Sequence, residues 1–396
     1  MSETVTEKKG FKIETTALRA YTMLGALILI WLFFFWQTEG IFLSSRNLSN
    51  LMLQTSVTGI IAIGMLMVII SGNIDLSVGS LLALAGGVAA ITLTNMGYGL
   101  VPSILAAIAV STAIGFLQGA LTAYFSIPSF IVTLGGLLAW RGAIKGISNS
   151  ETIPISNEWF KFIGQGYAGD AALILNADYE VAFNFGWVLA IIGIVLILLF
   201  TYRRVKADKE YGLGDGNLGA AMLKMILPIA VIIGFVFVMN SYEGIPIPVL
   251  IFLAVALLGY FITNNTTFGR YLYAIGGNAD AARLSGINNK INIVKVFAFL
   301  GALTGIAAII YTARVGSATP DAGTLLELDA IAACVIGGTS LMGGRGTVFG
   351  ACVGALIMAT LDNGMSLLNV QDFMQELVKG GILVAAVGLD MIGKKS

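Results

Sequence analysis

The sequence predicts an all-α polytopic membrane protein with about 10–12 spanning helices, at about 20 residues a span. Two observations carry this prediction. Hydrophobic residues make up 57% of the 396 residues, and charged residues only 11%, against about 25% in an average soluble domain. A soluble fold with only 22 basic and 22 acidic residues would expose large apolar patches. The composition therefore excludes a soluble enzyme, a disordered chain and a disulfide scaffold.

Charge-free runs mark the expected spans. They are continuous, as at 190–200, and lack the alternation of membrane barrel strands. Helices satisfy their own backbone groups in lipid, so helices are the predicted elements. The longest run has breaks at 95–99 and 126–128 and is long enough for three spans. The runs are 20–38, 47–74, 76–140, 181–202, 225–242, 244–269, 296–313, 330–344 and 346–361, followed by an apolar segment at 377–392.

The charged residues, the cysteines and the absence of histidine exclude several kinds of functional site. The formal net charge is zero, so no basic face for nucleic acid is expected. The chain has no histidine, which removes imidazole catalysis, histidine metal sites and histidine proton relays. Cys334 and Cys352 lie within apolar runs and are interpreted as small packing residues. We therefore expect no cofactor, no metal and no nucleic-acid partner.

Basic residues gather in four segments, which the positive-inside rule places in the cytoplasm. Counting twelve hydrophobic segments from an inside N-terminus puts all four on one side and the loop 146–180 outside. We expect the chain, 1–396, to form a single transmembrane domain with both termini in the cytoplasm. The basic segments are the tail 1–19, the loop 203–224, the segment 270–295 and the end with Lys394 and Lys395.

Two motifs resemble nucleotide-binding loops, and both are rejected. Residues 214–219 match GxGxxG, but a basic loop precedes them where a strand is required. Residues 388–395 resemble a phosphate-binding loop, but Lys395 stands where Ser or Thr would hold magnesium. No acid–base pair or nucleophile group has useful spacing either. We therefore expect no ATPase or other enzyme activity in this chain.

Two places interrupt the apolar runs with glycine and polar residues. In 71–79, Asp75 is flanked by apolar runs, and a carboxylate there should face the bundle interior or water. It either belongs to a translocation path or gate, or caps the next helix together with Ser77. The second interruption, 336–347, follows Asp329 and either spans or re-enters the membrane. Each interruption precedes a helix of small residues, which predicts two faintly related halves.

Three GxxxG spacings allow helices to approach closely. They lie at 115–119, 301–305 and 350–354. They indicate either packing within the bundle or a contact between subunits.

The loop 273–288 contains a short predicted helix between two spans. Asn278 can cap this helix, and Asp280 lies in its first turn, where negative charge is favourable. So short a helix has too little apolar area to be stable alone, so it either docks on a partner or lies on the membrane surface. Its small face and its end are formed by Ala281, Ala282, Leu284 and Gly286.

Four motifs together make the sequence resemble the permease subunits of bacterial ABC sugar importers, in the ribose/xylose branch. They lie at 72–80, 127–135, 276–286 and 328–340. Each motif is only suggestive, but the set is specific, and the resemblance extends from about residue 50 to 390. Residues 187–263 hold more apolar runs than ribose-type permeases have. Xylose permeases are similarly long, so the resemblance favours D-xylose as the solute.

The resemblance implies a pore subunit of the bacterial inner membrane, not an enzyme, that pairs with a second copy of itself. Its partners would be a cytoplasmic ATP-binding subunit and a periplasmic or extracellular sugar-binding protein. The loop 273–290 would be the coupling loop that fits a groove of the ATPase, through Gly277, Asn278, Ala281, Ala282, Arg283, Ser285 and Gly286. The polar residues proposed for the pathway or gate are Asn73, Asp75, Ser77, Thr133, Asp329, Thr339 and Ser340.

The rival function is an ion-coupled secondary transporter of a small polar solute. Such a transporter needs buried carboxylates or other ion ligands in mid-span. Asp75 and Asp329 are the only strong candidates, and we expect neither a histidine nor a buried lysine to accompany them. Uptake that needs ATP and partner proteins would favour the importer subunit, and uptake abolished by an ionophore alone would favour the rival.

The basic segments give a prediction of topology. Cysteines placed at Asp208 and Asn289 should react in whole cells only with membrane-permeant reagents, and a cysteine at Gln165 with impermeant ones. The measurement is thiol labelling of single-cysteine variants. Labelling of position 208 from outside would overturn the orientation.

Overall fold

The computed structural model describes residues 15–169, 179–211 and 218–392. Parts of four predicted loops and tails lie outside these ranges. They are residues 1–14 of the N-terminal tail, 170–178 of the loop predicted to lie outside, 212–217 with Gly214 and Gly216, and 393–396 with Lys394 and Lys395.

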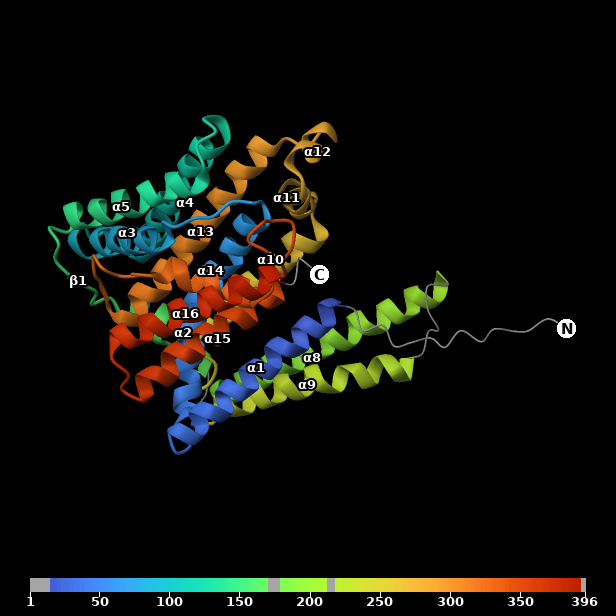
Figure 1. Ribbon diagram of the computed structural model, residues 1–396. Helices are drawn as coiled ribbons and strands as arrows, with labels where there is room; N and C mark the ends of the chain where they lie inside the picture. Colours follow the sequence, from blue (N-terminus) through green and yellow to red (C-terminus); the bar gives the residue numbers. More distant parts are fainter. Residues whose placement is uncertain (1–14, 170–178, 212–217, 393–396) are drawn as a thin grey trace.

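Helices form nearly all of the regular structure within the described ranges (Figure 1). Two short strands, β1 (Ile153–Pro154) and β2 (Ser317–Ala318), pair antiparallel with Ile153 opposite Ala318. The predicted all-α class is confirmed. The helices are α1 (Thr15–Gln37), η1 (Ile41–Leu43), α2 (Ser45–Ile70), α3 (Val78–Ala90), η2 (Ile91–Asn95), α4 (Leu100–Tyr124), α5 (Ser129–Ile147), α6 (Glu158–Gln165), α8 (Tyr179–Glu210), α9 (Leu218–Asn240), α10 (Ile247–Asn265), α11 (Thr267–Gly277), α12 (Ala279–Leu284), α13 (Asn289–Val315), α14 (Leu326–Ile336), α15 (Val348–Leu367) and α16 (Asp372–Ile392).

Helix α2 is the centre of the bundle. It packs against α10, α13, α14 and α15, and side chains such as Ile60 and Met65 are fully buried. Helices α8 and α9 instead form an antiparallel pair, seen at the lower right of Figure 1. Side chains of this pair, including Phe200 and Leu223, are mostly exposed, as expected for surfaces that face lipid. The functional core is therefore built around α2, and the α8–α9 pair is peripheral to it.

Nine helices in the described ranges are long and apolar enough to cross a membrane, a stretch of about 30 Å. They are α2, α3 with η2, α4, α5, α8, α9, α10, α13 and α15. Helix α14 has 11 residues, about 16 Å at 1.5 Å a residue, so it is too short to span. The three remaining hydrophobic segments of the prediction correspond to α1, α14 and α16.

Two of the GxxxG spacings build the contact between α4 and α13. A Cβ added at Gly119 would lie 2.9 Å from the Cα of Val294, and one at Gly305 would lie 2.9 Å from the Cα of Ile108. The third spacing packs α15 on α14, where Gly354 lies against Ala333. The packing interpretation is therefore confirmed for all three spacings.

The two cysteines also serve packing. Cys334 is fully buried, and its thiol donates a hydrogen bond to the carbonyl oxygen of Ala62 at 3.2 Å. Cys352 is partly buried, and neither cysteine forms a disulfide. The sequence interpretation of both residues is confirmed.

Candidate functional site

The first interruption leaves an irregular segment, 71–77, between α2 and α3. Its backbone finds partners on α5. The Ser129 hydroxyl accepts a hydrogen bond from the Ile74 amide at 3.2 Å, and the Thr133 hydroxyl lies 3.4 Å from the Ile74 carbonyl oxygen, to which it donates. Irregular backbone is tolerated inside a membrane only where protein or a water-filled cavity satisfies it. Predicted residue Thr133 therefore supports this segment.

Asp75 is 2% exposed and bonds within its own turn. Its carboxylate accepts hydrogen bonds from the amide and the hydroxyl of Ser77, both at 2.7 Å. The Gln118 amide of α4 donates to the Ser77 hydroxyl at 2.8 Å, which extends the network to a second helix. Asn73 donates to the Ser71 hydroxyl at 3.0 Å. This arrangement is an Asx turn directly before α3, whose N-cap residue Ser77 makes no side-chain capping bond. The gate and capping roles of Asp75 both stay predictions.

The second interruption follows α14. The segment 337–347 folds back on itself, with the Ser340 amide donating to the Arg345 carbonyl oxygen at 3.0 Å. Thr339 and Ser340 are both buried. The Gly344 amide donates to the Ile70 carbonyl oxygen at 2.9 Å, so this loop touches the end of α2 where the first interruption begins. The two predicted interruptions are therefore in contact.

A polar cavity lies between α2, α13, α14 and α15. It has two adjoining lobes of about 400 and 360 Å³ that share Gln54, Arg314 and Ser366. Pockets of this size commonly hold small molecules. We call it the outer cavity, because it lies at the end of the bundle that the basic segments predict to face outward. Its other lining residues are Asn47, Asn50, Leu53, Val57, Thr58, Tyr311, Asp321, Gly323, Thr324, Leu326, Asp329, Ala359, Asp362, Asn363 and Leu367.

The carboxylates of the outer cavity are paired with lysines. The ammonium of Lys379 lies 3.1 Å from Asp329 and 2.7 Å from Asp362, which joins α14, α15 and α16. Lys145 lies 3.3 Å from Asp321. Lys379 serves two carboxylates, and the Arg314 guanidinium of the lining supplies the third positive charge, so three cations face three carboxylates. Amide and hydroxyl groups make up the rest of the polar lining. Such groups suit an uncharged ligand rich in hydroxyls.

The predicted pathway residues do not form a single site. Asp329 lines the outer cavity, whereas Asn73, Asp75, Ser77 and Thr133 belong to the first interruption. Thr339 and Ser340 belong to the second.

Sequence reasoning missed much of the outer cavity, including Gln54, Asn363 and Arg314. A signal was present, because Gln54 is a polar residue inside an apolar run and Arg314 directly follows the run 296–313. What was missing was the information that these helices meet.

Helix α12 forms as predicted and stands at the top of the molecule in Figure 1. The Asn278 side chain accepts a hydrogen bond from the Ala281 amide at 2.9 Å and so caps the helix. The Asn289 side chain donates to the Ala279 carbonyl oxygen at 2.8 Å and ties α12 to the start of α13. Arg283 lies 3.4 Å from Asp280 in an exposed ion pair.

One residue of the predicted coupling face is buried, and the coupling role of the whole set stays a prediction. Ala282 is only 4% exposed, because it lies on the side of α12 that faces its own chain. Ala281, Arg283, Ser285 and Gly286 are exposed, as are Gly277 and Asn278. Leu284, which the coupling set omitted, is 85% exposed. Leu284 is therefore accessible to a partner that docks on α12.

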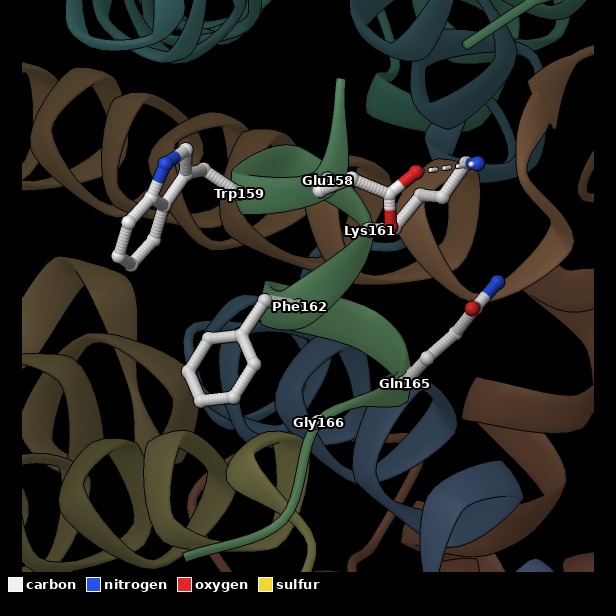
Figure 2. A pocket seen from close by; sticks show the side chains of 6 residues that line it. All are labelled: Glu158, Trp159, Lys161, Phe162, Gln165 and Gly166. Carbon is white, nitrogen blue, oxygen red and sulfur yellow. Dashed lines mark hydrogen bonds and ion pairs between the residues drawn. The ribbon is translucent and has the colours of Figure 1, made fainter. Parts of the chain in front are cut away.

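Helix α6 borders the outer cavity from the far end of α13. The Gln165 side chain donates to the carbonyl oxygens of Ala313 and Arg314, both at 3.1 Å. Figure 2 shows Trp159 and Phe162 on one side of the helix, with Gln165 and the ion pair of Glu158 and Lys161 on the other. These residues and Gly166 line a hollow of about 450 Å³, and Trp159 is 54% exposed.

Comparison with known proteins identifies the family to which this chain belongs. Residues 47–206 and 217–387 match the family described as the branched-chain amino acid transport system / permease component. The xylose transport system permease protein XylH of Haemophilus influenzae is 46% identical over 385 residues, 97% of this chain and 99% of the relative. XylH of Escherichia coli K12 is 43% identical over 387 residues, 98% and 95% of the two chains. The ribose import permease protein RbsC of E. coli K12 is 37% identical over 350 residues, which are 88% of this chain and 87% of the relative. No solved structure matches the chain.

The fold and the site thus define a polytopic permease, not an enzyme. The chain belongs to the family of permease components of ATP-driven (ABC) importers that includes the xylose and ribose permeases. It is a multi-pass protein of the bacterial inner membrane. Membership in this family decides against the ion-coupled transporter.

The hydrogen bonds between Asp75 and Ser77 give a prediction. Asp75→Asn keeps an acceptor for the Ser77 amide and should transport normally, whereas Asp75→Leu removes it and should lower the free energy of unfolding by about 0.5–2 kcal/mol. Thermal unfolding in detergent and uptake in membranes are the two measurements. If Asp75→Leu abolishes uptake at unchanged stability, the residue belongs to the gate and the capping interpretation is wrong.

Proposed function

We propose that this chain is the membrane pore for D-xylose, driven by ATP hydrolysis in a separate subunit. We choose D-xylose as the solute because nearly the whole chain is similar to two xylose transport permeases. The outer cavity supports it, because its paired carboxylates and its amide and hydroxyl groups suit an uncharged sugar. Sugar would enter the outer cavity and pass between the interrupted segments beside α2.

We assign the two ends of the molecule to different partners. Helix α12 would seat in a groove of the cytoplasmic ATPase through Ala281, Leu284 and Ser285, with Arg283 at its edge. The sugar-binding protein would dock at the opposite end, over α6, which carries the exposed Trp159 and whose Gln165 bonds to Arg314 of the outer cavity. A second copy of the chain would complete the transporter, with both termini in the cytoplasm.

Reconstitution tests the proposed function. Proteoliposomes that hold this chain and its ATPase should accumulate xylose only when a xylose-binding protein and ATP are supplied. Gln54→Leu removes an amide from both lobes of the outer cavity, and one lost hydrogen bond of about 1 kcal/mol should raise the apparent KM about fivefold.

Matched measurements separate the possible results. Asn264→Leu changes an exposed amide outside the cavity and should leave the KM unchanged. Uptake that needs no ATP and collapses with an ionophore would contradict the proposal. An unchanged KM in Gln54→Leu would remove the outer cavity from the sugar pathway.

The exposed face of α12 gives a separate prediction. Leu284→Glu places a charge where the ATPase groove would bury an apolar side chain, so the variant should insert in the membrane but lose the ATPase on co-purification. The matched control is Trp159→Glu, which changes an exposed apolar residue on α6 and should retain the ATPase. Equal recovery of the ATPase with both variants would refute the coupling role of α12.

A further inference from the structure

Three backbone segments meet directly beside the start of α12. They are the end of α2 at Ile70, the end of α11 at Gly276, and the loop 343–346 of the second interruption. The Gly344 amide donates to the Ile70 carbonyl oxygen at 2.9 Å. The Tyr273 hydroxyl of α11 donates to the Gly346 carbonyl oxygen at 2.8 Å. We call this meeting point the glycine junction.

Backbone packs on backbone at the junction with no room for a side chain. A Cβ added at Gly276 would overlap the Ile70 carbonyl oxygen and lie 2.7 Å from the Gly344 nitrogen. Gly343 has a φ of +85°, and a Cβ there would lie 2.9 Å from the Gly276 carbonyl oxygen and 3.1 Å from the Gly72 nitrogen. The end of α11 therefore touches both interrupted segments at once.

Each interrupted segment leads from the junction to the wall of the outer cavity. The segment 71–77 ends at α3, where Gly79 packs against Gly323, and a Cβ added at Gly323 would lie 2.7 Å from the Gly79 carbonyl oxygen. Gly323 lines the outer cavity. The segment 337–347 joins α14, whose Asp329 lines the same cavity.

We propose that Gly276 is a positioning residue that couples α12 to the sugar pathway. Because α12 follows α11 directly, a movement of α12 on its partner would displace Gly276. The tight backbone contacts would pass that displacement to both interrupted segments and so to Gly323 and Asp329 of the outer cavity. Close-packed contacts of this kind transmit small shifts, since they cannot deform without a change of packing.

The inference rests on the proposed function of α12, and the test separates the two. Gly276→Ala and Gly142→Ala are compared in the complete transporter with ATPase and binding protein. Gly142 lies on α5, and a Cβ there meets nothing within 4 Å. Three quantities are measured for each: recovery of the ATPase, ATP hydrolysis, and xylose uptake.

Gly276→Ala should retain the ATPase and its hydrolysis but lose about tenfold in uptake, the size expected when a tight contact is overpacked. Gly142→Ala should match the unsubstituted chain in all three. Normal uptake by Gly276→Ala would overturn the inference, and so would loss of the ATPase, which would make Gly276 a part of the docking surface only. Failure of the unsubstituted chain to couple ATP to uptake would instead refute the proposed function.

A second variant keeps the test decisive if Gly276→Ala does not reach the membrane. Tyr273→Phe removes only the hydrogen bond to Gly346. It should raise the number of ATP molecules hydrolysed per sugar by about twofold or more, because one contact of the junction is weakened. An unchanged ratio would overturn the inference.

Discussion

Inside a membrane, the amide and carbonyl groups of irregular backbone need hydrogen-bond partners from the protein or from water in a cavity. The rest of this structure depends on how the two interrupted segments obtain those partners. The segments 71–77 and 337–347 have no helix of their own to satisfy their amides and carbonyls. They obtain partners from α5, through Ser129 and Thr133, and from the end of α2, through Ile70. This requires α2 to be buried at the centre and its neighbours to approach closely, which the glycines of α4, α13 and α15 permit.

The same constraint places the functional parts of the permease. Because the two interrupted segments must be enclosed, they lie between the bundle's core helices and connect its two ends. The outer cavity opens where α14 and α15 meet α2 and α13, and Lys379 keeps Asp329 and Asp362 paired there. Helix α12 lies at the other ends of the segments. A transporter that must alternate access needs such a connection, and the α8–α9 pair at the periphery leaves it undisturbed.

Much of the fold could be predicted from the sequence, because charge and apolar length alone decide where a helix can cross lipid. The breaks at 95–99 and 126–128, the cap of α12 by Asn278 and the packing role of the GxxxG spacings all follow from local patterns. The outer cavity could not be predicted, since Gln54 and Arg314 lie far apart in the sequence and only tertiary packing joins them. The burial of Ala282 could not be predicted, because a helix of six residues carries too little pattern to show which side faces its own chain.

The central claim is that events at α12 reach the outer cavity through the interrupted segments. The most direct measurement is the rate at which a membrane-impermeant thiol reagent modifies Ser366→Cys, an exposed position that lines both lobes of the cavity. The rate is measured in the assembled transporter with and without ATP, against the unsubstituted chain as background. The account predicts that ATP changes the rate. Equal rates in a transporter that is importing xylose would contradict it.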